Sequence, residues 1–236
     1  MRILDSQLVV FLGDSITEHL VAVNDWMETQ TDGLPPIGTQ VYVDRHENRG
    51  WTAMLANRIQ LAYPGRWIRY VNAGIGGNSS RQMLARFDAD VLARYPQWLL
   101  LSAGVVEVRR TYQADRASER VPLDEYVVNL TMMISRALKA GTQVILLQPT
   151  PHARPVTDGP PEVSLQDVND LTRQYGIAMM QVAQETEAGF VPLFEKFLEV
   201  ENRLASQASL YADEVHLNAR GDLLYSQIVY QYLDSQ

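Results

Sequence analysis

Short runs of apolar residues alternate with longer helical patterns along the chain. Gln7–Leu12 is a nearly continuous apolar run, which is typical of a strand buried on both faces of a sheet. Four further runs have the same character: Trp67–Val71, Trp98–Leu101, Val144–Leu147 and Phe190–Pro192. Between these runs, apolar positions recur with helical spacing in Trp51–Ala62, Ser80–Arg94, Leu123–Ala140, Leu165–Thr186, Glu195–Ser206 and Ala219–Leu233. This alternation predicts one α/β domain over residues 1–236, with a mostly parallel sheet of about five strands.

Residues that favour helix ends agree with these boundaries. Ser164 and Asp167 resemble a capping box with Asp in place of Glu, and Asn218 is a favoured N-cap for the last helix. Gly141 follows the third helical pattern, where a left-handed residue commonly ends a helix.

Three connections are longer than a minimal loop: His19–Asn48, Val108–Pro122 and Pro149–Val163. The third contains five prolines, so it can continue neither a helix nor a central strand. Each connection follows a predicted strand, which places it at the carboxyl edge of the sheet, where open α/β sheets bind ligands.

The composition of the chain excludes several classes of partner and site. The chain has 20 basic and 28 acidic residues, a net charge of −8, which argues against nucleic acid or an anionic membrane as the main partner. It has no cysteine, which excludes disulfides, thiolate nucleophiles and zinc–cysteine sites. No apolar run reaches the roughly 18 residues of a membrane span. The sequence also shows no secretory signal pattern, so a cytoplasmic location is expected.

A serine follows the first predicted strand, in Gly13–Thr17. At such a turn its hydroxyl can point over the sheet edge, although Gly, Asp and Ser are also common in ordinary turns. A second segment, Asp213–Asn218, precedes the last helix and holds an acid three residues before a histidine. Histidine can activate a serine hydroxyl, and the acid can hold the imidazole in the required tautomer. A surface histidine beside a solvated acid is the alternative interpretation.

A glycine-rich loop, Asn72–Ser79, follows the second strand. Gly77 there can present its backbone N–H to an oxyanion. A plain glycine turn is one alternative, and a dinucleotide-binding loop is another. We discount the dinucleotide loop because the third glycine of G-x-G-x-x-G is absent and the following acids, Asp88 and Asp90, fall within a predicted helix.

Taken together, these segments resemble the SGNH hydrolases, also called GDSL esterases. FLGDSIT at residues 11–17, VNAGIGGNSS at 71–80 and DEVHLN at 213–218 match the family's blocks in order, and the resemblance covers nearly the whole chain. Residues 81–108 also resemble a bacterial esterase branch of the family. The resemblance implies a three-layer, flavodoxin-like sandwich.

For the site, the resemblance implies Ser15 as nucleophile, His216 as base and Asp213 as the acid that orients the base. The backbone N–H groups of Ser15 and Gly77 would form the oxyanion hole. Asp14 would support the serine loop and, with Asn78 and Val106, border the substrate. No metal or organic cofactor is implied.

One block departs from the family pattern. Where Gly-x-Asn-Asp is usual, this chain has Gly104-Val105-Val106-Glu107, so Val106 replaces the asparagine that gives a third oxyanion donor. Losing one such donor costs on the order of 10² to 10³ in rate. Three interpretations remain open: a slower esterase, an esterase with a substitute donor such as Asn78, or a catalytically impaired binding protein.

The expected function is hydrolysis of small acyl or acetyl esters, on a carbohydrate or a lipid headgroup, through an acyl-enzyme. The oligomeric state is not predicted. A further group of residues has weaker claims to the site, as pocket walls or, for His46, as a metal ligand: His19, His46, His152, Trp26, Tyr42, Trp51 and Tyr112.

Overall fold

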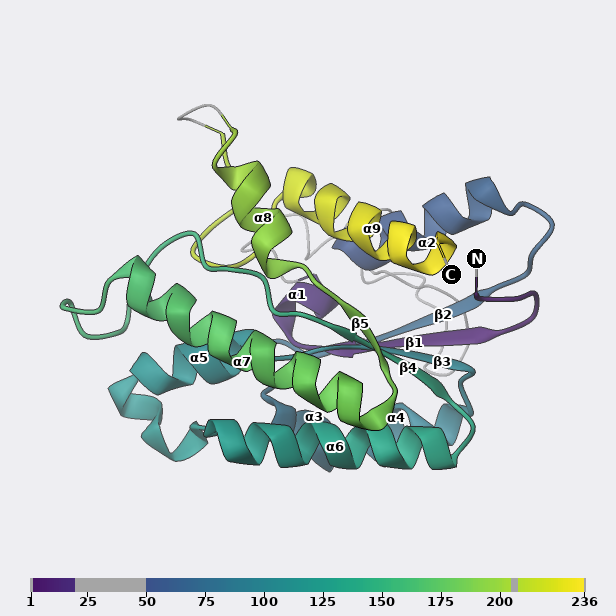
Figure 1. Cartoon of the computed structure of the whole chain (residues 1–236), viewed down its shortest axis with the longest axis horizontal. Helices are drawn as coiled ribbons and strands as arrows, with labels where there is room; N and C mark the ends of the chain where they lie inside the picture. Colours follow the sequence, from purple (N-terminus) through teal and green to yellow (C-terminus); the bar gives the residue numbers. More distant parts are fainter. Residues whose placement is uncertain (1, 20–49, 205–207, 236) are drawn as a thin grey trace, which may run out of the picture.

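Five parallel strands form one sheet in the order β2-β1-β3-β4-β5 (Figure 1). The structure is a computed structural model and describes residues 2–19, 50–204 and 208–235. The strands are β1 (Leu8–Gly13), β2 (Arg69–Gly74), β3 (Trp98–Ser102), β4 (Gln143–Leu147) and β5 (Gly189–Val191). The order reverses at β1, because β2 lies on one side of it and all later strands lie on the other. This is the flavodoxin-like order, and it opens a crevice at the carboxyl ends of β1 and β3.

Helices cover both faces of the sheet, which confirms the predicted three-layer α/β fold (Figure 1). One face carries α2 (Gly50–Ala62), α8 (Phe194–Glu201) and α9 (Ala219–Asp234). The other carries α3 (Ser80–Ala85), α4 (Phe87–Asp90), α6 (Leu123–Lys139) and α7 (Leu165–Thr186).

Alternate residues of β1 supply the two cores. Val9 and Phe11 belong to the core under α2, α8 and α9, whereas Val10 and Leu12 belong to the core under α3, α6 and α7. Because successive side chains of a strand point to opposite faces, an unbroken apolar run is what a strand covered on both sides requires.

The helix ends agree with the predicted caps. The Ser164 hydroxyl accepts from Asp167 N, and Asn218 accepts from the backbone of Arg220 and Gly221. Gly141 has φ +81°, the left-handed conformation predicted for it after α6. Helix α8 ends at Glu201, earlier than the predicted Ser206, which lies outside the described residues.

Two segments differ from the prediction. The single helix predicted over Ser80–Arg94 is three short pieces: α3, α4 and the 3-10 turn η2 (Leu92–Arg94). The break falls at Arg86 (φ −102°, ψ 4°), whose guanidinium donates to the strand-end carbonyls of Ala73 and Gly13. That tie draws the backbone out of regular helix.

The other difference lies after β3, where a long connection was predicted from Val108. Helix α5 (Val105–Tyr112) occupies its start, followed by the 3-10 helix η3 (Ala114–Glu119). The valines of α5 are β-branched and weak helix formers, so local propensity gave little sign of this helix. Helices α1 (Ser15–Glu18) and α5 begin where β1 and β3 finish, beside the crevice.

Candidate active site

Ser15 lies at the start of α1, directly after β1. The Asp14 side chain caps this helix: its Oδ1 accepts from Ile16 N at 3.0 Å. The Asp14 carbonyl also accepts from the backbone of Thr17 and Glu18. Gly13 has to lack a side chain, because a Cβ there would lie 2.1 Å from Thr17 Oγ1. These local contacts turn the chain sharply and present Ser15 at the sheet edge.

His216 reaches the same place from the other end of the chain. It lies in a turn that is closed by an antiparallel bridge between Tyr211 and Leu217. Asp213 Oδ1 accepts from the backbone N–H of Val215 and His216 at 2.9 and 2.8 Å. The turn therefore places the Asp213 carboxylate beside the imidazole of His216.

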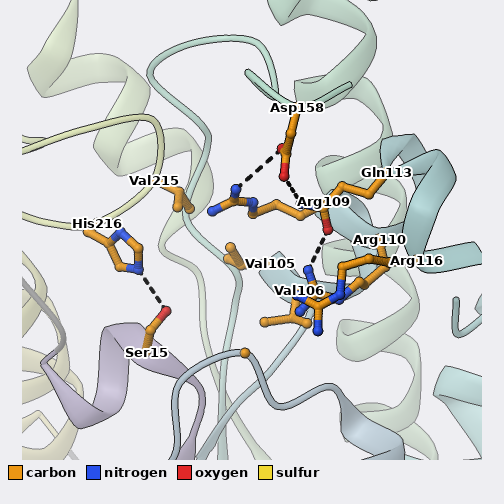
Figure 2. A pocket seen from close by; sticks show the side chains of 11 residues that line it. Ser15, Val105, Val106, Arg109, Arg110, Gln113, Arg116, Asp158, Val215 and His216 are labelled. Carbon is orange, nitrogen blue, oxygen red and sulfur yellow. Dashed lines mark hydrogen bonds and ion pairs between the residues drawn. The ribbon is translucent and has the colours of Figure 1, made fainter. Parts of the chain in front are cut away.

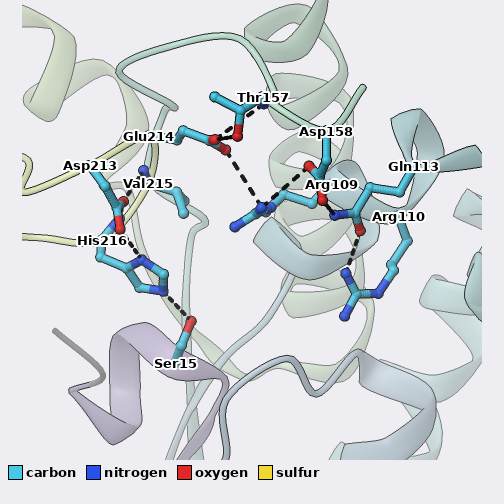
Figure 3. Close-up of polar contacts among 10 residues, drawn as sticks. All are labelled: Ser15, Arg109, Arg110, Gln113, Thr157, Asp158, Asp213, Glu214, Val215 and His216. Atoms are coloured by element: carbon cyan, nitrogen blue, oxygen red, sulfur yellow. Dashed lines mark hydrogen bonds and ion pairs between the residues drawn. The ribbon is translucent and has the colours of Figure 1, made fainter. Parts of the chain in front are cut away.

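The three side chains form one continuous hydrogen-bonded chain (Figure 3). Asp213 Oδ2 lies 2.7 Å from His216 Nδ1, and His216 Nε2 lies 2.8 Å from Ser15 Oγ. The sequence predicted that these residues converge, although Ser15 and His216 are 201 positions apart. The geometry is that required for proton transfer from a hydroxyl to an imidazole.

Electrostatics favours an ionised Asp213. Partial burial of its carboxyl opposes ionisation, but the backbone N–H groups of Val215 and His216 and the His216 ring outweigh it, so the pKa of Asp213 lies below its usual value. An ionised carboxylate accepts a hydrogen bond from a protonated Nδ1, which leaves the lone pair on Nε2 directed at the Ser15 hydroxyl.

Ser15 and His216 open into a cavity of about 280 Å³ (Figure 2). Gly77 (φ +73°) and Val106 line the same cavity, so the structure brings four of the predicted site residues together. Val106, which the sequence resemblance places where the family has asparagine, has a hydrocarbon side chain with no hydrogen to donate.

Asp14 and Asn78, also predicted at the substrate site, do not line this cavity. Asp14 is buried beneath Ser15 and is occupied in capping α1. Asn78 Oδ1 accepts from Arg86 Nε at 2.8 Å. These contacts engage the Asp14 carboxylate and the Asn78 side-chain oxygen within the fold, and the expectation that the two residues contact substrate stays a prediction.

Three arginines that the sequence analysis did not single out line the cavity: Arg109, Arg110 and Arg116. Arg109 Nη2 lies 3.6 Å from carboxylate oxygens of both Asp158 and Glu214. The missed signal was the spacing of Val106 and Arg110, which are one helical turn apart and share a face of α5. The sequence analysis treated the chain from Val108 as a long connection, so the helical spacing of Val106 and Arg110 was not recognised.

The weaker histidine candidates lie nearby but outside this cavity. His152 is buried, and that burial, with the charges of Arg109 and His216, lowers its pKa to about 3. Its Nδ1 lies 3.4 Å from Thr172 Oγ1, so it is a neutral interior histidine. His19 is buried too, with Nδ1 3.5 Å from Asp222 Oδ2.

The aromatic candidates have structural roles. Trp51 stacks on Tyr225 in the core at a centroid distance of 4.5 Å, and the Tyr112 hydroxyl donates to the Asp167 carbonyl. Trp26, Tyr42 and His46 lie outside the described residues.

Two further features were searched for in the described ranges. Within them, no helix combines the length and the apolar character needed to cross a membrane. The same part of the chain contains no group of three or more His, Asp or Glu side chains placed to hold a metal ion.

Comparison with known proteins places the chain in a family. A model described as the GDSL-like lipase/acylhydrolase family matches residues 11–224. An acetylxylan esterase of Geobacillus stearothermophilus is 29% identical over 228 residues, covering 96% of this chain and 94% of that enzyme.

Solved structures agree with this match. Axe2, an acetylxylan esterase from the same organism, has 27% identity and a TM-score of 0.79, covering 99% of this chain and 96% of its own. LAE5, an α/β hydrolase from the metagenome of Lake Arreo in Spain, shares the fold with 24% identity and a TM-score of 0.75, covering 98% and 97%. The chain therefore belongs to the GDSL-like lipase/acylhydrolase family, the SGNH hydrolases, and is an esterase of that family.

Proposed function

We propose that this esterase hydrolyses small acyl esters through an acyl-enzyme formed on Ser15. The observation that carries the proposal is the hydrogen-bonded chain from Asp213 through His216 to Ser15 Oγ. Catalytic mutants of the relative Axe2 replace a serine, an aspartate and a histidine, and the last two are three positions apart, like Asp213 and His216.

In the first half of the reaction, Ser15 Oγ forms a bond to the acyl carbon while its proton passes to His216 Nε2. The carbonyl electron pair moves onto oxygen, and the backbone N–H groups of Ser15 and Gly77 donate to that oxyanion. When the carbonyl re-forms, the bond to the alcohol oxygen breaks, and the imidazolium returns its proton to the departing alcohol.

In the second half, water replaces the alcohol. His216 Nε2 takes a proton from water as its oxygen bonds to the acyl carbon, and the resulting oxyanion collapses to release the acid. Ser15 regains its proton from His216, so the enzyme returns to its starting state. Asp213 remains ionised and keeps the imidazole oriented throughout.

The substrate is a small acyl ester, and an acetyl group on a carbohydrate is the form we favour. The relative of known activity is an acetylxylan esterase. A cavity of about 280 Å³ accommodates a short acyl group together with part of an alcohol. A catalytically impaired binding protein is the alternative that Val106 favours, and the next experiment separates the two.

The test is hydrolysis of p-nitrophenyl acetate by the purified chain, with Ser15→Ala as the variant. We expect turnover by the wild type and its loss, on the order of 10⁴-fold or more, in the variant. Ser164→Ala, which removes a helix cap outside the cavity lining, is the matched control and should remain active. A fluorophosphonate should label only the chain that retains Ser15. Activity that survives Ser15→Ala refutes the mechanism, and an unreactive wild type supports the binding protein.

A further inference from the structure

We propose that the Arg110 guanidinium takes the place of the third oxyanion donor that Val106 cannot supply. The inference rests on the proposed acyl-enzyme mechanism and adds a catalytic residue to it. The substrate oxygen that becomes negatively charged would be bound by the backbone N–H groups of Ser15 and Gly77 and by Arg110 Nη2.

Helix α5 places Arg110 next to the vacant donor position. Val106 and Arg110 are four residues apart on this helix, so their side chains leave the same face, one above the other. Both line the cavity that contains Ser15 and Gly77 (Figure 2). A longer side chain from the next turn can therefore reach the space that the family's asparagine would fill.

The end of the Arg110 side chain lies against the Gly77 backbone. A Cβ built on Gly77 would lie 3.5 Å from Arg110 Nη2, its nearest neighbour outside the adjoining residues. The Gly77 N–H is the proposed second donor of the oxyanion hole. Arg110 Nη2 therefore lies near the Gly77 α-carbon, in the cavity that also contains Ser15.

Two polar contacts hold the guanidinium in this orientation. Arg110 Nε donates to Glu119 Oε2 at 3.0 Å, and Nη1 donates to Gln113 Oε1. Gln113 is itself fixed by a hydrogen bond to Asp158 (Figure 3). Nη2 has no hydrogen-bond partner among the described residues, so the nitrogen nearest Gly77 keeps its donors for a ligand. A donor fixed before the reaction is the arrangement that stabilises a transition state best.

Burial strengthens the effect of this charge. The Arg110 side chain is only 7% exposed, and its desolvation, with the charge of Arg116, lowers its pKa despite the opposing charge of Glu119. A guanidinium remains protonated at neutral pH even so. A positive charge that is largely buried acts on an oxyanion more strongly than one surrounded by water.

The two other cavity arginines fit the role less well. Arg109 Nη2 is shared between the carboxylates of Asp158 and Glu214. Arg116 is 42% exposed and pairs with Glu119 through Nε at 2.8 Å. Arg136 on α6 provides the control, because it has the same chemistry and pairs with a carboxylate, that of Asp88, but does not line the cavity.

The test compares Arg110→Met with Arg136→Met in p-nitrophenyl acetate hydrolysis. We expect kcat to fall on the order of 10²-fold in Arg110→Met, with KM within about threefold, because the lost interaction exists only in the transition state. Arg136→Met should remain within about threefold of the wild type in both constants. Arg110→Lys, which keeps the charge but loses the planar fork, should fall between.

A boronic acid that bonds to Ser15 gives a second readout that does not depend on turnover. The tetrahedral boronate places an oxygen in the oxyanion hole, so its affinity should fall in parallel with kcat/KM in Arg110→Met. The double variant Val106→Asn/Arg110→Met should recover at least about tenfold of the lost turnover, because the amide restores a donor.

Several results would overturn the proposal. A kcat for Arg110→Met within about threefold of the wild type would exclude the donor role, and a rise in KM alone would show that Arg110 binds an anionic part of the substrate instead. A fall in kcat with unchanged boronate affinity would mark a structural role. Failure of Ser15→Ala to abolish turnover would instead refute the mechanism itself, so the two failures are distinguishable.

Discussion

The two sides of the cavity are built differently. On the proton-transfer side, Ser15, Asp213 and His216 match the family pattern, and local backbone turns hold each residue in place. On the proposed oxyanion side, Gly77 and Val106 line the cavity, Val106 stands where the resemblance leads us to expect an asparagine, and side chains from α5 and η3 fill the surroundings. Proton transfer needs a group that titrates near neutral pH, which restricts the choice of residue. An oxyanion can be stabilised by any fixed hydrogen-bond donor at the right distance, so several residue types can serve on that side.

A buried carboxyl group supports each side of the cavity. Asp14 lies beneath Ser15, where burial raises its pKa to about 7 despite the hydrogen bond from Ile16 N. Glu107 lies beneath the oxyanion side, where it accepts from Ser80 N at 2.5 Å and from Gly104 N at 3.1 Å. Burial raises the pKa of Glu107 as well, against its backbone hydrogen bonds. Asp14 thus supports a single turn, whereas Glu107 connects the loops that follow β2 and β3.

The largest expected effect comes from Asp213→Asn, which attacks the proton-transfer side alone. The amide oxygen can still accept from the Val215 and His216 backbone, but its NH₂ group faces Nδ1 and favours the tautomer with the proton on Nε2. That nitrogen can no longer accept the Ser15 proton. We expect kcat for p-nitrophenyl acetate to fall on the order of 10³- to 10⁴-fold, with KM little changed.

Asp170→Asn, an exposed carboxylate on α7, is the control for this substitution and should retain full activity. Should Asp213→Asn retain more than about one tenth of wild-type turnover, the carboxylate does not set the tautomer and the proton-transfer side needs another interpretation.

The next effect is on stability and concerns the support of Ser15. Because the folded-state pKa of Asp14, about 7, lies above its unfolded value of 3.8, the folded state binds this proton more tightly. The contribution of this Asp14 proton to the free energy of unfolding therefore falls as pH rises from about 4 to 7 and stays low above that range. Asp14→Asn keeps the acceptor for Ile16 N and cannot ionise. Relative to the wild type, the variant should gain roughly 2–3 kcal/mol in free energy of unfolding between pH 5 and 8, measured by urea denaturation.

Asp167→Asn provides a control of opposite sign, because hydrogen bonds from the side chain and backbone of Ser164 lower the pKa of Asp167. That variant should lose stability relative to the wild type, not gain it, as pH rises through the acid range. A stability difference between Asp14→Asn and wild type that stays constant from pH 5 to 8 would show that Asp14 is ionised in the folded chain.

The sequence predicted those parts of the fold and site that depend on local rules. Helix α7 begins at the predicted residue because its capping box lies within four consecutive positions of the sequence. The five strands were found within a few residues because burial on both faces gives unbroken apolar runs. Ser15 and His216 were placed at the sheet edge by the same logic, since each follows or precedes a recognisable element.

What sequence reasoning missed depends on contacts between distant segments. Helix α5 begins at valines and is held by Glu107, whose partner Ser80 is 27 positions away. The direction of Asn78 is set by Arg86, eight positions on, and not by its own loop. Arg110 could be located only after α5 was known to be helical, because only then does its side chain share a face with Val106.

The smallest effect sharpens the comparison most, because it concerns the residue in which the oxyanion side departs from the family. With Arg110 acting as a donor, Val106→Asn adds an amide to an oxyanion hole that already has a third partner, so kcat should rise by no more than about tenfold. In the Arg110→Met background the same substitution should give a larger gain. Both gains are measured with p-nitrophenyl acetate, and Val105→Asn, one residue earlier on α5, is the matched control that should give no gain. A rise of about 10²-fold or more in the wild-type background would show that the natural chain works without a third oxyanion donor. The oxyanion side would then lack one of its groups, whereas the proton-transfer side has all three of its residues.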